Sequence, residues 1–421
     1  MIFIGIDWST RLARGQHGKK PHGCGGFVTR HDDICILYKS GQVNKEFRIP
    51  VSAKGFSKLL KTIEEIEPDS KEVYIGIETD KNILADYLLA ANYKVYSLNP
   101  LSVNRFKERY TTSGKKDDKF DAFNIASILY TDRNNFKPIV LSSNEVRELQ
   151  IHCQSVDNFI RQRSRLINLL NAELLRYFPA FSGFFSDLSS NVAMNVLQKI
   201  SRPSEIVDMT EASFEERIKD IKYFYKKRRT EFFKHLKDEV IIFENLLEDA
   251  FSLRVTILAE QVLFLNATLA RLQKIIQEKF SEHSDANIFN SIPGAGPRIA
   301  PALLVCFGDN RSRFESYQQV QCYSGTAPVT EKSGKSFHQI KMRRMCNKSF
   351  RYIFQHLSFT CLIQTPWARE HYDKQISIGK THSAALRSIG NKWAKIIHSM
   401  WKNKTEYSDD IFKNKRTLNA A

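Results

Sequence analysis

The sequence has no pair of cysteines at the spacing of a zinc site. Its seven cysteines are scattered, and their odd number argues against a closed disulfide framework. We therefore expect reduced thiols in a cytosolic protein. Cys24 lies near His17 and His22, but a flexible basic loop explains this Gly-, His- and Lys-rich stretch better than a metal site does.

The sequence also shows no pattern typical of a targeting or membrane-spanning segment. The apolar start of the chain reaches Asp7 at once and has no cationic lead, so we expect no signal peptide. No apolar run approaches the length that crosses a bilayer. The sequence thus predicts a cytoplasmic protein with no membrane partner.

Acidic residues are outnumbered in this chain. There are 63 basic against 46 acidic residues, which gives a formal charge of +17. Such a surplus favours a polyanionic partner, through phosphate contacts and counterion release, although a merely soluble basic protein would have the same composition. The 421 residues, 42% of them apolar, are enough for two or three domains with a sizeable core.

The first part of the sequence predicts an α/β domain. Short β-branched runs predict strands over residues 2–7, 33–38, 44–49, 73–78 and 94–98. Helices are predicted over residues 53–66, 81–91 and 119–130. The close linkage of the early strands indicates an antiparallel meander, a βαβ run follows, and helices should cover the sheet. Residues Thr10 to Arg30 are expected to form an extended loop.

Two apolar series at helical spacing predict a long helical region. The first series comprises Leu149, Cys153, Val156, Ile160, Ile167, Leu170 and Leu174. The second keeps heptad spacing and comprises Leu258, Val262, Leu265, Leu269, Leu272 and Ile276. These helices could pair within one chain or with another chain, and a purely structural arm is the default interpretation. Short helices joined by turns are expected between them.

The last part of the sequence contains a turn that resembles a helix-hairpin-helix turn. It runs from Ile292 to Ala300, and Gly294 and Gly296 permit a tight bend before Arg298 and an apolar helix. Exposed backbone N–H groups in such a turn can hold a phosphate, although Gly-x-Gly also occurs in plain turns.

A basic stretch with interleaved aromatic residues follows that turn, and a basic amphipathic helix over residues 393–404 ends the predicted structure. The candidate nucleic-acid-binding cations of the basic stretch are Lys335, Lys341, Arg343, Arg344, Lys348 and Arg351.

Four carboxylates are placed as a nucleic-acid-cutting metal site would place them. Asp7 and Glu78 each end an apolar run, and Asp118 and Asp121 lie three residues apart at the start of a predicted helix. Residues three apart share a helix face, and a hard divalent ion takes oxygen ligands. If the acids converge, two Mg²⁺ ions about 4 Å apart could activate a nucleophile and stabilise a leaving oxygen.

Each of these acids also has a simpler interpretation. Alone, each would be an ordinary strand-end or helix-start residue, the latter favoured by the helix dipole. Asp117 and Asp80 are nearby rivals. The joint pattern within one α/β segment nevertheless favours a metal site.

Two serines lie within the basic stretch, in the sequence Ser333-Gly334-Lys335-Ser336. A serine hydroxyl among cations could attack phosphorus, because positive charge lowers its pKa and offsets the charge of a phosphorane. Taken alone, however, the segment is better interpreted as a plain Ser-Gly turn.

Together and in this order, these motifs resemble the DEDD transposases of insertion sequences, a family that includes the Piv-type DNA invertases and the RNA-guided bridge recombinases. The resemblance covers nearly the whole chain. The segments that carry it are Gly5-Ile6-Asp7 with Ser9, Ile77-Glu78-Thr79, Lys116 to Ala122, Ile292 to Ala300, and Tyr323 to Pro328 leading to Ser333-Gly334.

The resemblance implies a RuvC-like, RNase H-type nuclease domain over residues 1–140, with Asp7, Glu78, Asp118 and Asp121 binding Mg²⁺ or Mn²⁺. It implies a helical coiled-coil arm over residues 141–286, used in assembly of a homo-oligomer, either a dimer or a tetramer. A mostly helical transposase domain over residues 287–405 would carry the nucleophile Ser333, and residues 406–421 would form a basic tail.

The same resemblance implies an activity and partners. Ser333 would form a covalent phosphoserine link to DNA, and the acids, from a partner subunit, would complete the site. Target and donor DNA would be chosen by a structured guide RNA from the element itself.

The chain departs from the family pattern at three places. Asp80 stands where a glycine is usual, Cys346-Asn347 replaces a usual Gly-Asn pair, and the loop from Thr10 to Arg30 is longer than expected. Ser336 remains a rival to Ser333. Two other functions stay open: a RuvC-like, metal-dependent junction endonuclease that uses water as its nucleophile, and a catalytically inactive nucleic-acid-binding protein.

Overall fold

The computed structural model describes residues 1–8, 30–78, 82–110, 117–242, 247–333 and 337–409. For residues 332, 333 and 337–340 it describes the backbone alone. The chain divides into two compact units, Met1–Leu141 and Ser142–Ala421, and each is considered by itself.

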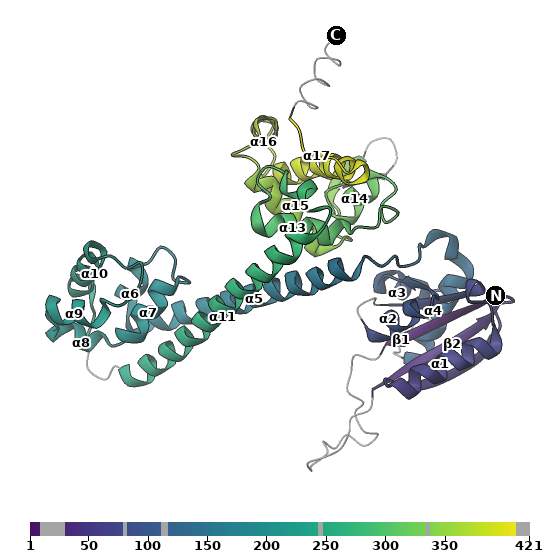
Figure 1. Ribbon diagram of the computed structural model, residues 1–421, viewed down its shortest axis with the longest axis horizontal. Coiled ribbons are helices and arrows are strands. Elements are labelled where there is room, and N and C mark those ends of the chain that lie inside the picture. Colours follow the sequence, from purple (N-terminus) through teal and green to yellow (C-terminus); the bar gives the residue numbers. More distant parts are fainter. Residues whose placement is uncertain (9–29, 79–81, 111–116, 243–246, 334–336, 410–421) are drawn as a thin grey trace, which may run out of the picture. The chain divides into compact units, whose positions relative to one another are not determined.

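The first unit is built on a mixed five-stranded sheet (Figure 1). Its strands are β1 (Ile2–Trp8), β2 (His31–Tyr38), β3 (Val43–Pro50), β4 (Val73–Ile77) and β5 (Lys94–Ser97). They lie in the order β3-β2-β1-β4-β5, with β1, β2 and β3 antiparallel and β1, β4 and β5 parallel. The predicted α/β class and the antiparallel meander are confirmed.

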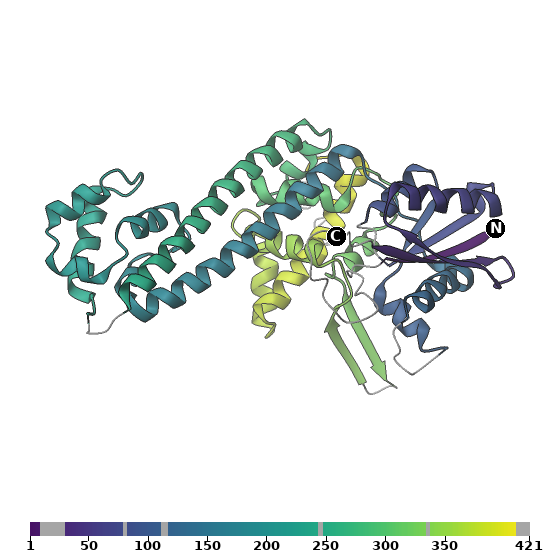
Figure 2. The ribbon, with the colours of Figure 1, turned by 90° about the horizontal axis from the view of Figure 1, so that it is seen from below.

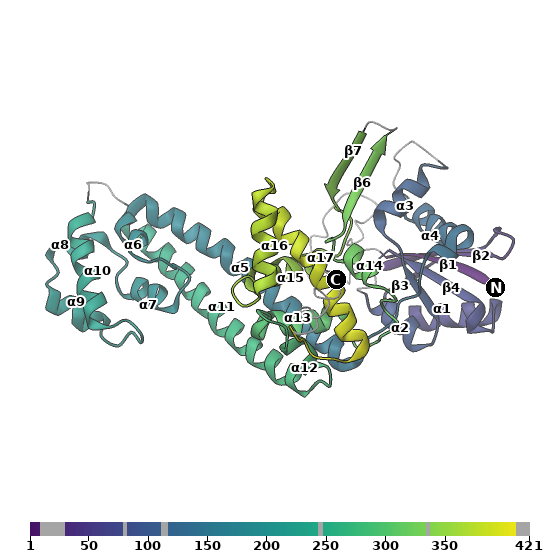
Figure 3. The ribbon, with the colours of Figure 1, turned by 90° about the horizontal axis from the view of Figure 1, so that it is seen from above.

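Helices cover both faces of this sheet (Figures 2 and 3). On one face, α1 (Ala53–Ile66) and α2 (Ile83–Ala90) pack against Ile2, Ile4 and Ile6 of β1. On the other face, α3 (Pro100–Lys107) and α4 (Asp118–Asp132) pack against Phe3. The two 3₁₀ turns are η1 (Ser70–Glu72) and η2 (Arg133–Asn135). Helix α3 was not predicted from the sequence.

Two glycines let α4 lie directly on the sheet. Gly5 and Gly76 are partners on the parallel strands β1 and β4. A Cβ at Gly5 would lie 1.9 Å from the carbonyl oxygen of Ala122, and one at Gly76 would lie 2.7 Å from Cγ2 of Ile125. Because real side chains never approach so closely, any larger residue would push α4 away from the strands.

Two long helices, α5 (Asn144–Tyr177) and α11 (Glu248–Glu282), lie side by side in the second unit (Figure 1). The heptad residues Leu258, Val262 and Ile276 of α11 are buried, and they share apolar clusters with residues of the α5 series. Of the two arrangements left open by the sequence, the structure shows pairing within one chain. The coiled-coil geometry itself stays a prediction.

Short helices cap one end of this pair (Figure 1). They are α6 (Pro179–Phe184), α7 (Asn191–Lys199), α8 (Pro203–Asp208), α9 (Glu211–Ile218) and α10 (Lys226–Glu239). Phe181 and Phe232 are buried at the centre of their core, with ring centroids 5.7 Å apart.

The other end of the pair carries the C-terminal helices (Figure 3). They are α12 (Ala286–Asn290), α13 (Gly296–Phe307), α14 (Tyr317–Tyr323), α15 (Lys348–Thr360), α16 (Pro366–Ser377) and α17 (His382–Asn403). A hairpin of β6 (Pro328–Ser333) and β7 (Phe337–Met342), which the sequence did not predict, precedes α15. Leu149 of α5 and Ile276 of α11 belong to the core of these helices. The arm and the C-terminal helices therefore belong to one compact unit, and the predicted domain boundary between residues 286 and 287 stays a prediction.

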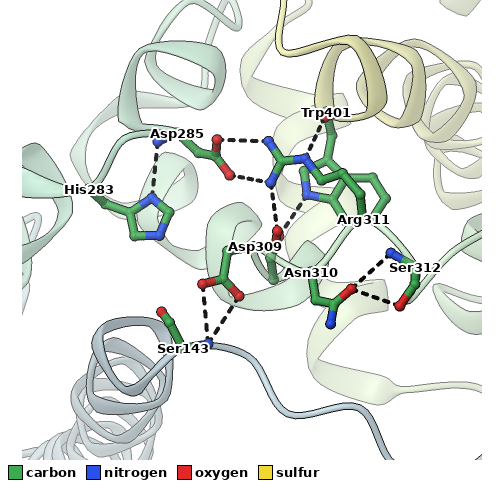
Figure 4. Close-up of polar contacts among 9 residues, drawn as sticks. Ser143, His283, Asp285, Asp309, Asn310, Arg311, Ser312 and Trp401 are labelled. Atoms are coloured by element: carbon green, nitrogen blue, oxygen red, sulfur yellow. Dashed lines mark hydrogen bonds and ion pairs between the residues drawn. The ribbon is translucent and has the colours of Figure 1, made fainter.

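A polar network fixes the start of α5 to this C-terminal core (Figure 4). The backbone N–H of Ser143 donates to both carboxylate oxygens of Asp309, at 3.1 and 3.2 Å. Arg311 forms a two-pronged ion pair with the buried Asp285 and donates from Nε to the carbonyl oxygen of Trp401 at 2.9 Å. These contacts fix the first turn of α5 to the C-terminal helices within the second unit.

By length and composition alone, α11 could cross a bilayer. An 18-residue window of it has a mean hydropathy of 1.3, and 28% of that window is buried. The sequence analysis did not anticipate this stretch. A core helix of a soluble protein has the same character, and the heptad face of α11 packs on α5.

Candidate metal centre and nucleic-acid interface

The structure brings three of the four predicted acids together. One ligand oxygen from each of Asp7, Asp118 and Asp121 lies within 4.8 Å of the others. Asp7 follows Gly5 by two residues, so its side chain is on the sheet face that α4 covers. Asp118 and Asp121 stand in the first turn of α4, and the close approach permitted by the two glycines carries that turn to the end of β1.

Glu78 is placed beside this group but is not a member of it. It directly follows Ile77, whose partner on the parallel strand β1 is Ile6, so Glu78 and Asp7 follow neighbouring strand ends. Its side chain is half-buried.

The rival acid Asp117 has a separate task. It is the N-cap of α4, and its carboxylate accepts the backbone N–H of Lys119 at 3.1 Å. The other rival, Asp80, lies outside the described residues.

A lysine that the sequence did not mark contacts one of the acids. Lys107, the last residue of α3, forms an ion pair with Asp121. The side chain of Asp121 is only 9% exposed and that of Lys107 is 21% exposed. No sequence motif marked Lys107, because its relevance depends on a helix that was not predicted.

A second missed pair borders the cluster. Asp33 of β2 is the register partner of Asp7 on β1, so both side chains lie on the face covered by α4. Arg48 of β3 donates from Nη2 to Oδ2 of Asp33 at 2.7 Å. The hydrogen bond to Asp33 raises the pKa of Arg48, and the charge of Asp118 adds to this rise. Asp33 is therefore already engaged by a cation.

The donor set fits a hard divalent cation. Two carboxylates from the first turn of α4 and one from the end of β1 can bind one ion through their oxygens, the ligand type that Mg²⁺ and Mn²⁺ prefer. Cys35, two residues beyond Asp33 on the same face, adds no thiolate ligand. Burial, followed by the nearby Glu46, raises the pKa of Cys35 to about 12.

The candidate nucleophile Ser333 is on a different element. It is the last residue of β6, and its register partner is Phe337, the first residue of β7. The backbone therefore places Ser333 next to the hairpin connection. Lys335 and Ser336 belong to that connection, which lies outside the described residues.

The glycine turn lies between α12 and α13, and one of its backbone amides is already hydrogen-bonded within the protein. Gly294 has a φ of +79° and Gly296 a φ of +54°, conformations that favour glycine. The N–H of Gly294 donates to Oε1 of Gln364 at 2.8 Å. Arg298 in the next turn faces Asp157 at 3.5 Å. Phosphate binding here remains a prediction.

The basic stretch divides into paired and surface cations. Lys341 forms an ion pair across the hairpin with Glu331, at 2.6 Å, and Arg351 donates to the carbonyl oxygens of Arg343 and Arg344. Arg344 is exposed, as is Lys348. Arg351 therefore holds the segment after β7 in place, and a contact of the exposed Arg344 and Lys348 with phosphate stays a prediction.

Comparison with known proteins finds transposases along most of the chain. A transposase family model of the DEDD, IS110 type matches residues 29–179, and the model described as "Transposase IS116/IS110/IS902 family" matches residues 286–373. Glu78, Asp118 and Asp121 lie inside the first match and Ser333 inside the second, whereas Asp7 precedes the first.

Individual relatives extend over nearly the full length. The "Mini-circle putative transposase for IS117" of Streptomyces coelicolor is 26% identical over 97% of this chain and 95% of its own length. The "Insertion element IS116 uncharacterized 44.8 kDa protein" of Streptomyces clavuligerus is 24% identical over 89% of this chain and 96% of its own.

Proposed function

The chain belongs to the IS116/IS110/IS902 family of transposases and is a DNA transposase, and from this premise we propose that it cuts and rejoins DNA through a covalent phosphoserine intermediate. The metal part of the proposal is carried by the convergence of Asp7, Asp118 and Asp121 within 4.8 Å, in a family whose DEDD name refers to such acids. The serine part is supported by the position of Ser333 inside the second family match, over residues 286–373. The RNase H-like fold that the family implies agrees with the mixed sheet of the first unit.

The acids hold the metal in this proposal. Asp7, Asp118 and Asp121, with Glu78 from the neighbouring strand end, would bind Mg²⁺ or Mn²⁺, which when bound would neutralise charge on the phosphodiester. Asp118 is exposed and Asp121 is buried, so the cluster has an outward side open to DNA and an inward side fixed by packing.

Ser333 supplies the nucleophile. Its Oγ forms a bond to phosphorus while the bond from phosphorus to the leaving deoxyribose oxygen breaks, and the serine proton ends on that oxygen. Attack by a hydroxyl of the new partner strand reverses the step and releases Ser333. The exchange of one phosphoester for another needs no external energy source, which suits a reaction that rejoins the strands it cuts.

The proposal extends to partners. DNA is the partner that the family implies. We further propose a structured guide RNA, a homo-oligomer in which acids of one subunit meet the serine of another, and a cytoplasmic location. The formal charge of +17 supports binding of one or more polyanions.

The test compares two serines of one hairpin. Full-length Ser333→Ala and Ser336→Ala proteins would be incubated with DNA carrying the element ends, the element's noncoding RNA and Mg²⁺. We expect Ser333→Ala to abolish the protein–DNA adduct, seen as a shifted band in a denaturing gel, while DNA binding persists. Ser336→Ala should keep the adduct.

An adduct that survives Ser333→Ala would refute the assignment of the nucleophile. Free hydrolysed ends without any adduct in the wild-type protein would instead indicate water as the nucleophile, as in a RuvC-like junction endonuclease.

A further inference from the structure

Lys107 holds a position in which it can act on the candidate metal centre without being a ligand. It ends α3 (Pro100–Lys107), which packs against α4, and its ammonium forms an ion pair with Asp121. Asp121 is in turn one of the three acids whose oxygens lie within 4.8 Å of one another. The lysine therefore contacts the cluster on its buried side.

The burial of Asp121 gives this contact its importance. A carboxylate that is 9% exposed is costly to keep charged unless a counter-charge replaces its lost hydration. With Asp7 and Asp118 close by, mutual repulsion adds to that cost. Lys107 supplies one positive charge at this point.

A divalent ion would supply the same compensation at the same oxygens. An ammonium and a divalent ion repel each other, so both cannot stay in contact with one carboxylate without loss of binding energy. Lysine also has a flexible four-carbon stem and a compact charge, so it can leave the acid and turn towards water while α3 stays in place.

We infer that Lys107 is an exchangeable counter-ion that competes with the divalent metal for Asp121. This inference rests on the proposed metal site and goes beyond it: Lys107 keeps the acids folded and paired when no metal is bound, and it weakens metal affinity by the free energy of its own displacement. It is a positioning residue and not a catalytic one.

The first test is metal affinity in the full-length protein, measured by titration calorimetry with Mn²⁺. Lys107→Met keeps most of the apolar stem and removes the competing charge. We expect the Kd for Mn²⁺ to fall about tenfold, equivalent to about 1.4 kcal/mol. In EDTA, the Tm of the variant should also fall, because Asp121 loses its counter-charge.

Lys119→Met is the matched control. Lys119 is an exposed lysine in the first turn of α4, so its removal makes the same change in net charge close to the acids. The Kd for Mn²⁺ and the Tm in EDTA should both change much less than in Lys107→Met. Equal changes in the two variants would show a general charge effect and overturn the inference.

A second measurement uses the wild-type protein, so it works even if the Lys107→Met variant does not fold. Reductive methylation of lysines would be mapped by mass spectrometry in EDTA and in saturating Mn²⁺. Lys107 should be labelled several-fold faster with Mn²⁺, because displacement frees its ammonium, whereas Lys119 should be labelled equally in both. An unchanged rate at Lys107 would overturn the inference.

Failure of the inference and failure of the metal site are distinguishable. Mn²⁺ binding that is lost in Asp121→Asn but has an unchanged Kd in Lys107→Met overturns the exchange alone. A wild-type protein that binds no Mn²⁺ overturns the metal assignment and the exchange with it.

Discussion

The two units present their candidate groups in opposite ways. In the first unit, the acids depend on a helix packed directly on a sheet, so closely that a Cβ at Gly5 would lie 1.9 Å from the carbonyl oxygen of Ala122. In the second unit, Ser333 ends one strand of a two-stranded hairpin. Metal ligands need a fixed geometry, whereas a nucleophile that is delivered to DNA benefits from an element on which it can reach out. Substitutions in the two units should therefore fail differently.

The largest expected effect is on catalysis, at the acid turn. Asp118→Asn should lower the rate of strand transfer roughly a thousandfold, the scale of losing a group that stabilises transition-state charge, with little change in Tm. The measurement is recombination of a plasmid that carries donor and target sites. Asp117→Asn is the control one residue away: asparagine is also a good N-cap, so activity should be retained. Equal losses at both positions would remove the distinction between ligand and cap.

In the second unit, substitutions in the seam between α5 and α11 are expected to lower the stability of the fold. Leu265 is 6% exposed and faces the seam, whereas its neighbour Phe264 is 71% exposed. Leu265→Glu should lower the free energy of unfolding by roughly 3–4 kcal/mol, because it buries an unpaired charge, as measured by urea denaturation. Phe264→Glu should change it by less than about 0.5 kcal/mol.

The molecular mass in solution of the Leu265→Glu and Phe264→Glu proteins shows whether the seam lies within one chain or between chains. A Leu265→Glu protein with unchanged stability but half the native mass would place the seam between chains. The pairing of α5 with α11 in one chain predicts no such result.

Glycine-to-alanine substitutions should cost more free energy of unfolding in the first unit than in the second. Gly5→Ala should cost about 2–3 kcal/mol, because the new methyl group collides with the backbone of α4. Gly296→Ala in the second unit should cost about 1 kcal/mol: its φ is +54°, but a Cβ there meets no described atom within 4 Å. Thermal denaturation measures both, and the reverse order would contradict the packing account. Gly5→Ala should also lower the rate of strand transfer, though less than Asp118→Asn does, since it displaces Asp118 and Asp121.

The smallest effect is pH-dependent and concerns the base of α5. Burial alone would raise the pKa of Asp309, but hydrogen bonds from the Ser143 hydroxyl and backbone outweigh it, so its pKa lies below the ordinary value. A lowered folded-state pKa gives stability that is present above the unfolded value of about 3.9 and is lost as the pH falls through the folded value.

Asp309→Asn should therefore reduce stability at pH 7 by less than about 1 kcal/mol, because the carboxylate is partly solvated, and this difference should shrink below pH 4. Chemical denaturation at pH 7, 5 and 3.5 measures it. A difference that grows towards low pH would contradict the assignment.

Local pattern predicted much of the first unit. The bounds of α1, Ala53–Ile66, agree fully with the sequence, and the predicted strands match to within two residues, because short apolar runs between turn residues have few other interpretations. The start of α4 was predicted within one residue from its acidic first turn. Helix α3 escaped because its eight residues have weak apolar periodicity.

The candidate site was harder to predict, because contacts between distant segments have no local signature. Lys107 and Arg48 became relevant only when the fold placed them beside Asp121 and Asp33. The pairing of Asp7 with Asp33 depends on the register between β1 and β2, which no single strand encodes. In the second unit, the heptads predicted the seam but not its partner helix. The hairpin was missed because its strands alternate weakly and carry many charges.

The central proposal is that the acids of one subunit and Ser333 of another act on one phosphodiester, and adduct formation tests it most directly. Ser333 peptides bearing a nucleotide would be quantified by mass spectrometry after incubation of wild-type and Asp7→Asn proteins with DNA, RNA and Mg²⁺. We predict an adduct on Ser333 in the wild-type protein and none in Asp7→Asn, with DNA binding equal in both. A Ser333 adduct that forms at the wild-type rate in Asp7→Asn would contradict the claim.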